Sequence, residues 1–265
     1  MSESTAPLAV VTGASTGIGR ALAQQFVDHG FDLVICADEP EIVQVGQELA
    51  RGGRLVTAEQ VDLSEPDSVT ALVSTIEATG RPVAAAALNV GIGANGRFHE
   101  TDLEGDLRVV DVNVRSTVHL AKLLVRDMVA RGDGKLLFTA SIAATAPGPY
   151  YATYAASKAF VHSFAGAIRF ELKGTGVTVT SLMPGPTDTA FFARNDMEDT
   201  MVAAMPKDDP ADVARDGFEA MMAGRAKVAG GSVLNKVQAF GSRAVPDQVK
   251  AALQSLLTKP GSGSH

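Results

Sequence analysis

A tyrosine and a lysine one helical turn apart are the side chains best placed to do chemistry in this sequence. The three tyrosines of the 265-residue chain are Tyr150, Tyr151 and Tyr154, and only Tyr154 is followed four residues later by a lysine, Lys158. Residues i and i+4 share one face of a helix, so the ammonium can lie near the phenol oxygen. A cation favours the phenolate and lowers the phenol pKa from about 10. The pair can therefore act as a general acid or base, the alternative being an incidental pair on a surface helix.

A serine strengthens the first interpretation. Ser141 directly follows an apolar run that ends at Ala140, thirteen residues before Tyr154. In parallel sheets, ligands bind at the carboxyl ends of the strands, so the Ser141 hydroxyl can face the same crevice as Tyr154. A polar residue that merely ends a strand is also common. Asn89, after another apolar run, and Asn113, within a long apolar stretch, are further polar residues that packing does not require.

A glycine-rich segment follows the first apolar run. Gly13, Gly17 and Gly19 form the spacing G-x-x-x-G-x-G, and helical spacing begins there. Glycines allow a tight turn beside a pyrophosphate, which the N–H groups at the start of a helix attract. No Lys-Ser or Lys-Thr follows Gly19, which excludes a Walker A loop. The segment predicts a dinucleotide site, the alternative being a turn that only packs helix on strand. The other residues expected at this site are Ser15, Thr16 and Ile18.

The end of the second apolar run carries an acid. Asp38 lies about 20 residues beyond the glycines, where a carboxylate can accept hydrogen bonds from the adenosine ribose and repel a 2′-phosphate. Neither Arg nor Lys occupies position 16 or positions 37–39. The sequence therefore favours NAD, with NADP as the alternative. Asp38 can also simply begin a helix with the proline that follows at position 40.

Alternating apolar runs and helical patterns predict the elements that position these residues. The runs are rich in Val, Leu and Ile with little alternation, as in parallel strands buried on both faces. We expect a single doubly wound α/β domain (a Rossmann fold) over residues 1–260, with helices on both faces of the sheet. The expected strands are Leu8–Thr12, Asp32–Ala37, Leu55–Val61, Val83–Leu88, Lys135–Ala140 and Val177–Leu182. The expected helices are 17–29, 40–50, 65–79, 103–131, 151–173 and 209–223.

Local signals set some of these boundaries. Ser64 and Asp67 predict a capping box at the start of the third helix. Gly30 and Gly80 stand where the first and third helices should stop. Residues 261–265 have the composition of a flexible linker or a remnant of cloning, and we leave them out of the expected fold.

Composition excludes several classes of function. Apolar residues make up 46% of the chain and charged residues 20%, which excludes a disordered protein. The net charge of −7 gives no electrostatic footprint for nucleic acid. The single Cys36 and the isolated histidines predict neither a disulfide framework nor a metal site. Without a signal-peptide pattern or an 18-residue apolar stretch, we expect a cytoplasmic protein that does not bind membranes.

Taken together, these motifs resemble the short-chain dehydrogenase/reductase (SDR) family. The likeness covers about residues 7–190 in the family's order and spacing. Leu88-Asn89-Val90-Gly91 departs from the family's N-N-A-G, and Ala226–Val233 matches the closing strand poorly, so the seventh strand is in doubt. The matching residues are Thr12–Gly19, Val61-Asp62-Leu63, Asn89, Asn113, Ser141, Tyr154, Lys158 and Pro184-Gly185.

The resemblance implies a role for each matching residue. Tyr154 would be the general acid/base, Ser141 would orient the substrate oxygen, and Asn113 would hold a water in the proton relay. Lys158 would bind the nicotinamide ribose and lower the Tyr154 pKa. The remaining cofactor contacts would come from Asp62 and Leu63 at the adenine, Asn89 on the adenosine-ribose side, Pro184 and Gly185, and Thr187 and Thr189 at the carboxamide or pyrophosphate.

The substrate side is less defined. Residues 186–207 would form a lid whose apolar side chains, with Phe191 and Phe192, suggest a hydrophobic alcohol or ketone; these side chains could equally face the core or a partner subunit. Tyr150 is a further candidate at the mouth of the site. Small and apolar residues along 103–131 and 151–173 suggest a homodimer or homotetramer, which the family commonly forms.

The sequence therefore predicts hydride transfer between a nicotinamide cofactor and a secondary alcohol or ketone. Alternatives are an NADPH-dependent carbonyl reductase and a non-catalytic dinucleotide sensor. A sensor should have lost part of the Tyr, Lys and Ser set, all of which is present.

Overall fold

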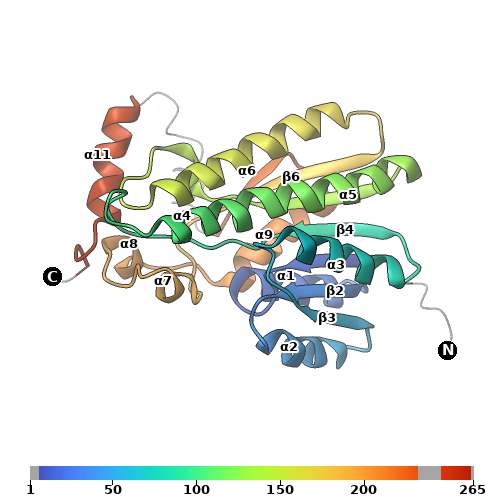
Figure 1. Ribbon diagram of the computed structural model, residues 1–265. Helices are drawn as coiled ribbons and strands as arrows, with labels where there is room; N and C mark the ends of the chain where they lie inside the picture. The colour runs from blue at the N-terminus through green and yellow to red at the C-terminus, as the bar shows by residue number, and fades with distance from the viewer. Residues whose placement is uncertain (1–5, 232–245, 264–265) are drawn as a thin grey trace.

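The sheet places the carboxyl ends of seven parallel strands side by side. The computed structural model describes residues 6–231 and 246–263 (Figure 1). Strand order is β3-β2-β1-β4-β5-β6-β7, and each neighbouring pair is parallel. This order confirms the expected doubly wound Rossmann-like fold. The strands are β1 (Leu8–Thr12), β2 (Asp32–Ala37), β3 (Val56–Gln60), β4 (Val83–Leu88), β5 (Gly134–Thr139), β6 (Val177–Pro184) and β7 (Lys227–Gly230).

Helices cover both faces of the sheet (Figure 1). On one face α3 (Pro66–Ala78), α5 (Ser116–Arg131) and α6 (Ala152–Glu171) bury apolar side chains in one core cluster. On the other, α1 (Gly17–Asp28), α2 (Glu41–Ala50) and α9 (Pro210–Met222) form a second cluster. The remaining helices are α4 (Leu103–Val110), α7 (Phe191–Arg194), α8 (Met201–Ala204) and α11 (Asp247–Thr258), with a π-helical turn η1 (Asp111–Arg115) and a 3₁₀ turn η2 (Ile142–Thr145).

Helix boundaries follow the sequence signals in part. Gly30 and Gly80 adopt positive φ angles of 86° and 65° just after α1 and α3, as expected of residues that end helices. The capping box at Ser64 is wrong, because α3 begins at Pro66 and has no side-chain cap. The Ser64 hydroxyl instead accepts a hydrogen bond from Arg108.

The long helix expected over 103–131 is divided by a π-helical turn. α4 runs to Val110, η1 spans Asp111–Arg115, and α5 begins at Ser116. The wider turn leaves carbonyls without their usual partners, and the Ser116 hydroxyl donates to Val112 O and the Thr117 hydroxyl to Asn113 O at 2.8 Å. Apolar periodicity continues across the turn, so the sequence pattern does not indicate it.

The two ends of the sheet depart from expectation. β3 is an edge strand with half-buried and exposed residues, because no strand in the described part of the chain pairs with its outer side. The expectation of burial on both faces therefore fails there. The doubtful seventh strand is present: Lys227–Gly230 pairs with Ser181–Pro184 of β6. At four residues β7 is too short for its pattern to stand out.

The C-terminal segment lies against residues 199–201. Asp199 accepts hydrogen bonds from the backbone N–H groups of Gly261 and Gly263, and Ser262 Oγ accepts one from Met201 N–H at 2.9 Å. Linker-like composition gave no sign of these bonds. Positions 264–265 and the stretch 232–245 lie outside the described residues. In the described part of the chain, no helix is long and apolar enough to cross a membrane.

Candidate active site

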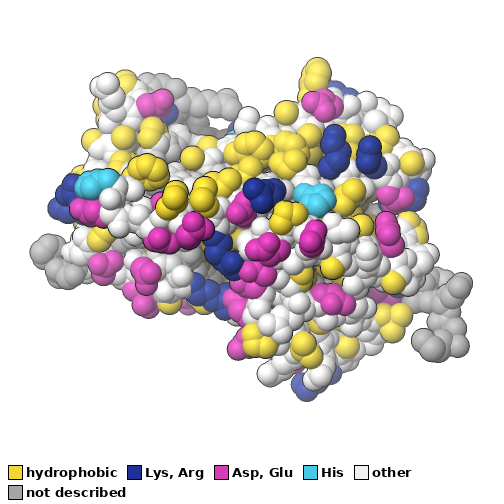
Figure 2. All heavy atoms as spheres, in the orientation of Figure 1, with side chains coloured by type: hydrophobic (Ala, Val, Ile, Leu, Met, Phe, Trp, Pro, Cys, Tyr) yellow, Lys and Arg dark blue, Asp and Glu magenta, His cyan; other side chains and the backbone are white. Residues whose placement is uncertain are grey.

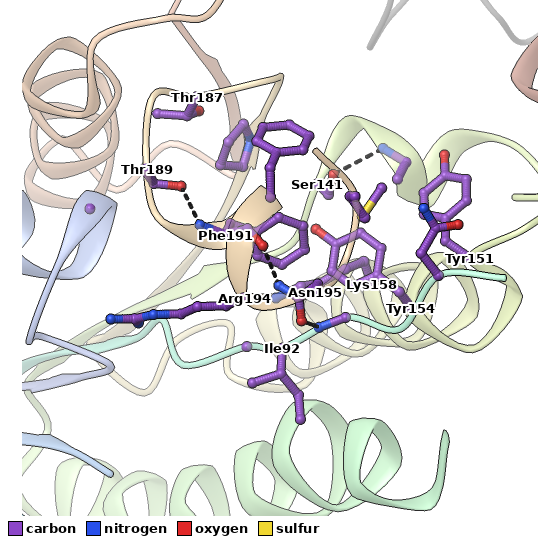
Figure 3. Close-up of a pocket in the computed structure, with 18 of the residues that line it drawn as sticks. Ile92, Ser141, Tyr151, Tyr154, Lys158, Thr187, Thr189, Phe191, Arg194 and Asn195 are labelled. Carbon is purple, nitrogen blue, oxygen red and sulfur yellow. Dashed lines mark hydrogen bonds between the residues drawn. The ribbon is translucent and has the colours of Figure 1, made fainter. Parts of the chain in front are cut away.

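A cavity of about 700 Å³ opens at the carboxyl ends of the strands. It runs from the glycine-rich turn after β1, past the ends of β4 and β5, to the lid segment and α11. Figure 3 shows Ser141 and Tyr154 at its centre, with Thr187 and Thr189 on one side and Tyr151 on the other. The residues that we expected to do chemistry and the residues that we expected to bind a dinucleotide therefore share one cavity.

The glycine-rich turn is shaped by close backbone contacts. Gly13 and Gly17 have φ angles of 65° and 55°. A Cβ at Gly19 would lie 1.9 Å from Gly13 O, so no larger residue fits there. α1 begins at Gly17 with no side-chain cap and no acid in its first turn, which leaves its N-terminal N–H groups available to an anion. These features fit the pyrophosphate of a dinucleotide.

Asn89 fixes this turn to the neighbouring strands. Its Nδ2 donates to Thr12 O and Gly13 O, both at 3.3 Å, and its Oδ1 accepts from the Thr139 hydroxyl at 3.0 Å. Asn89 lines the cavity, as expected of a residue near the cofactor. Its bonds show in addition that it joins the ends of β1, β4 and β5.

A cation from α4 lies among the acids at one end of the cavity. Arg108 Nη2 is 3.5 Å from Asp38 Oδ2, and Arg108 Nη1 is 2.8 Å from Asp62 Oδ2. Burial alone would raise the pKa of Asp62, but hydrogen bonds from Ser64 and the Arg108 guanidinium more than offset it, and the pKa is lowered. Asp38 and Arg108 line the cavity, whereas Asp62 and Leu63 do not. No sequence motif indicates that Arg108 lies at this end of the cavity.

A second ion pair joins the lid to the end of β2. Arg194, the last residue of α7, pairs with Glu39, and Glu39 also accepts a hydrogen bond from the Ser15 hydroxyl. All three residues line the cavity. The expected lid is thereby held across the cavity, against the glycine-rich turn.

Tyr154 is the centre of the expected chemistry. Its phenol is hydrogen-bonded to Ser141, whose hydroxyl also accepts from Ala143 N–H at 3.1 Å. Its ring lies 5.1 Å from the Phe191 ring and 5.9 Å from the Tyr151 ring, centroid to centroid. Burial raises the pKa of Tyr154 to about 12, although the Ser141 hydrogen bond opposes the rise. The sequence predicts that Lys158 lowers the Tyr154 pKa, but in the structure this pKa is raised.

Lys158 is buried near Tyr154. It is 4% exposed, its Nζ donates to Thr139 O at 3.0 Å, and it lies 5.9 Å from the Tyr154 ring centroid. Burial lowers the pKa of Lys158 from 10.5 to about 8. A Cβ at Gly91 would lie 2.6 Å from Nζ, so the glycine after Val90 makes room for the ammonium. Desolvation by burial is the main cause of both shifts, and no lowering of the Tyr154 pKa by Lys158 accompanies the proximity of the two groups.

Asn113 is placed by the π-helical turn rather than on the cavity wall. Its Oδ1 accepts from Ile92 N–H, and its Nδ2 donates to Ile92 O and Ser157 Oγ, all at 2.9 Å. These bonds connect the segment after β4 to the helix that carries Tyr154 and Lys158. The water that the resemblance assigns to Asn113 stays a prediction.

The expected lid is a loop whose two ends are joined. Thr187 bridges to Asp208, and Asp208 N–H donates to Pro186 O at 2.9 Å. Asn195 Nδ2 donates to Phe191 O, and its Oδ1 accepts from Gly93 N–H, so α7 is fastened to the segment after β4. Phe191 consequently lies over Tyr154, as Figure 3 shows.

Most of the expected site residues line the cavity. Those that do are Gly13, Ser15, Thr16, Gly17, Ile18, Gly19, Asp38, Asn89, Ser141, Tyr154, Lys158, Pro184, Gly185, Thr187, Thr189, Phe191 and Phe192. Asp62, Leu63, Asn113 and Tyr150 do not line it. Polar lining residues that the sequence did not single out include Glu39, Asn95, Arg108, Arg194, Asn195 and Gln254. Tyr151, which we expected with Tyr150 either at the mouth of the site or in packing, does line the cavity.

Comparison with known proteins identifies the family. A family model described as short chain dehydrogenase matches residues 7–199. The chain belongs to the short chain dehydrogenase family. A short chain dehydrogenase of Pseudocercospora fijiensis is 34% identical over 196 residues, which cover 72% of this chain and 63% of that protein. The match thus spans a little under two thirds of that relative. The resemblance inferred from the motifs is confirmed.

Solved structures of short chain dehydrogenases have the same fold. One from Sphingobium yanoikuyae in complex with NADPH superposes with a TM-score of 0.80 and 25% identity, covering 94% of each chain. Another, from Burkholderia phymatum in complex with NAD, gives a TM-score of 0.77 and 28% identity over 86% of this chain and 90% of its own. Members of this short chain dehydrogenase family with the same fold thus bind either dinucleotide.

Proposed function

We propose that the protein transfers a hydride between a nicotinamide dinucleotide and a secondary alcohol or ketone, with Tyr154 as the general acid/base. The observation that supports this best is that Ser141, Tyr154 and Lys158 meet in the cavity that the glycine-rich turn also lines. A non-catalytic dinucleotide sensor, the alternative of a different class, would have no need of the Ser141–Tyr154 hydrogen bond.

The residues of the cavity suit the proton half of the reaction. The bound dinucleotide supplies or accepts the hydride. Tyr154, protonated at neutral pH because its pKa is about 12, donates its proton to the carbonyl oxygen during reduction. The Ser141 hydroxyl would hold the same oxygen, and the Lys158 ammonium would bind the nicotinamide ribose. Phe191 and Tyr151 flank the Tyr154 ring.

The direct test is turnover. The purified protein is mixed with a panel of ketones and either NADH or NADPH, and oxidation of the cofactor is followed. We expect turnover of at least one hydrophobic ketone. A protein that binds the dinucleotide but turns over no ketone or alcohol in either direction contradicts the proposal and favours the sensor.

Charges at the adenosine end favour NAD. Asp38 lines the cavity there, with Glu39 beside it and Asp62 on the other side of Arg108. Asp38 and Asp62 pair with Arg108 and Glu39 pairs with Arg194, so three carboxylates face two guanidinium groups. The remaining net negative charge opposes a 2′-phosphate. Because Arg108 lies 3.5 Å from Asp38, an NADPH-dependent reductase stays the alternative.

Replacing Asp38 with alanine tests this preference. The change removes the repulsion and frees Arg108 to approach a phosphate, so the affinity for NADPH should rise relative to NADH by about tenfold or more. Dissociation constants for both cofactors are measured in the wild type and in Asp38→Ala. Asp28→Ala, on α1 away from the cavity, is the control and should leave the ratio unchanged. Equal ratios in wild type and Asp38→Ala contradict the assignment.

The substrate end of the cavity is mainly apolar. Phe191 and Phe192 line it, with Met197, Val202 and Met205 of the same segment. Phe192 and Met197 are also buried, at 7% and 3% exposure, so they pack against the protein as well as lining the cavity. These side chains support a hydrophobic substrate and a substrate role for residues 186–207.

Phe191→Ala tests the pocket role. The Phe191 ring lies 5.1 Å from that of Tyr154, so its loss opens space where a small ketone is held. We expect kcat/KM to fall about tenfold or more for small ketones and to fall less, or rise, for bulky ones. Steady-state kinetics across the ketone panel measure this change in selectivity. An equal effect on all ketones would assign Phe191 to packing of the lid alone.

We also propose that the protein forms homo-oligomers through α4 and α6. Leu103, Leu107 and Val110 follow one another along α4 at 66%, 46% and 40% exposure, and Phe160 of α6 is 41% exposed. Figure 2 shows hydrophobic side chains gathered in a band over these helices and α5. An apolar band of this kind supports association between copies of the chain.

A further inference from the structure

One wall of the cavity is built apart from the residues expected to bind the dinucleotide. In Figure 3, Tyr151 lies on the far side of Tyr154 from Thr189 and Arg194. α11 joins this wall, because the Thr258 hydroxyl donates to Pro149 O at 2.7 Å, two residues before Tyr151. The wall therefore combines the start of the catalytic helix with the C-terminal helix.

Tyr151 presents a buried phenol to this part of the cavity. It is 6% exposed and lines the cavity, and its ring stacks on that of Tyr154 at 5.9 Å and 27°. Its hydroxyl has no hydrogen-bond partner among the residues that the structure describes. The hydroxyl oxygen itself is not closed off, so it faces the cavity, where a ligand group can reach it. Burial raises the pKa of Tyr151, and the nearby Tyr154 raises it further by a smaller amount. The phenol therefore stays a neutral donor at physiological pH.

Two amides of the same wall also have unused hydrogen-bonding groups. Asn95 Oδ1 is buried with no partner in the described part of the chain, while its Nδ2 donates to Asp196 O at 3.4 Å. The next residue, Gly96, donates to Tyr150 O at 2.7 Å, which places Asn95 beside the tyrosines. Gln254 is one turn before Thr258 on α11; it is half-buried and lines the cavity, and no described residue is hydrogen-bonded to its side-chain amide.

These polar groups do not match a purely hydrophobic substrate. Leu257, Met197 and Met205 line the cavity with them, so the surroundings are apolar. An alkyl chain would displace water from the Tyr151 hydroxyl and the Gln254 amide and leave both unpaired, which costs about 1–3 kcal/mol for each group. A hydroxyl group can accept from the Tyr151 phenol, and it can donate to the Gln254 amide or accept from it. Asn95 Oδ1 is closed off from the cavity in this structure, and it can accept from the same hydroxyl after a rotation of the Asn95 side chain that breaks the 3.4 Å bond to Asp196 O.

We propose that Tyr151, Asn95 and Gln254 form a subsite for a hydroxyl group that the substrate carries a few carbon atoms from its reacting carbonyl. This inference rests on the proposed function and narrows its substrate class to hydroxy ketones and the corresponding diols. The 5.9 Å between the Tyr151 and Tyr154 rings places the subsite within reach of a small molecule held at Tyr154.

Matched ketones test the subsite. Each pair differs only by a hydroxyl replaced with a methyl group, as in hydroxycyclohexanone and methylcyclohexanone, and linear hydroxyalkanones vary the distance from the carbonyl. For at least one pair we expect wild type with NADH or NADPH to prefer the hydroxy ketone about tenfold or more in kcat/KM. Tyr151→Phe should remove most of that preference while changing kcat/KM for the methyl ketone little. Gln254→Leu, on a separate helix, should also lower the preference for the hydroxy ketone.

Tyr150→Phe is the matched control. It deletes the equivalent hydroxyl from the neighbouring residue, which lies outside the cavity. This change should leave kcat/KM for both ketones of a pair unchanged. Equal losses for both ketones in Tyr151→Phe would show that Tyr151 only packs against Tyr154, and no preference in any pair would also overturn the subsite. Calorimetric affinities of each pair for the cofactor-bound protein measure the subsite without turnover. If the proposed function is wrong, no ketone will be turned over. If only the subsite is wrong, ketones will be turned over with no preference for the hydroxy ketone of any pair.

Discussion

Tyr154→Phe is expected to lower kcat for ketone reduction by about 10²–10⁴-fold while leaving dinucleotide affinity within about twofold of the wild type. The phenol oxygen is the only atom lost. The ring keeps its contacts with Phe191 and Tyr151, so the cavity keeps its shape. Ser141 can still hold the carbonyl oxygen, which is why some turnover should remain. Steady-state kinetics and a cofactor titration measure the two effects separately.

The pH dependence gives the same prediction a second readout. Because burial raises the pKa of Tyr154 to about 12, the phenol stays protonated through the neutral and mildly alkaline range, and its protonation does not limit reduction there. Alcohol oxidation needs the phenolate, so its rate in the wild type should rise by about tenfold per pH unit below that pKa. This rise should be absent in Tyr154→Phe. Turnover in the variant within about tenfold of wild type, with the wild-type pH profile, contradicts the assigned role.

The parts of the site predicted from sequence are those that one short segment encodes. The glycines after β1 and the pair Tyr154 and Lys158 each lie within a single element, so their spacing alone indicates where they lie relative to one another. The fold followed from the same local periodicity. By contrast, Arg108 lies 70 residues from Asp38 and meets it only because α4 crosses the end of the sheet. Such a meeting has no local signal.

Burial was the other quantity that spacing could not supply. The spacing of four positions from Tyr154 to Lys158 predicts proximity, and proximity alone predicts a lowered phenol pKa. The structure surrounds both groups with apolar walls, and desolvation then determines both directions: the pKa of Tyr154 is raised and that of Lys158 is lowered. The π-helical turn at Asn113 was missed for a related reason, because apolar periodicity does not report the pairing of backbone carbonyls.

Lys158→Met should make the protein more stable at neutral pH and inactive. The ammonium is 4% exposed, and no carboxylate pairs with it in the described part of the chain; its hydrogen bond goes to Thr139 O. A pKa of about 8 instead of 10.5 corresponds to roughly 3 kcal/mol of unfavourable burial of the charge. Loss of the bond to Thr139 O offsets about 1 kcal/mol of that. The free energy of unfolding at pH 7 should therefore rise by about 2 kcal/mol in the variant.

The stability gain has a defined pH window. Between pH 8 and 10.5 the unfolded chain binds more protons at Lys158 than the folded protein, so the free energy of unfolding of the wild type rises with pH across that range. The variant lacks this titration, so the difference between the two proteins should shrink as the pH rises from 8 to 10.5. Tyr154 acts in the opposite direction above pH 10, but both proteins contain it, and its effect cancels in the difference. Denaturant unfolding at pH 7 and pH 10 measures this.

The same substitution separates a structural lysine from a functional one. Lys122→Met, on the exposed surface of α5, is the control and should change the free energy of unfolding by less than about 0.5 kcal/mol. If Lys158 held the fold together, its replacement would destabilise the protein at every pH. If it is present to bind the cofactor ribose, the variant should gain stability and lose dinucleotide affinity together, because a buried cation that weakens the fold is retained only for what it binds. A less stable variant, or a stability difference that does not change between pH 8 and 10.5, contradicts this account of the site.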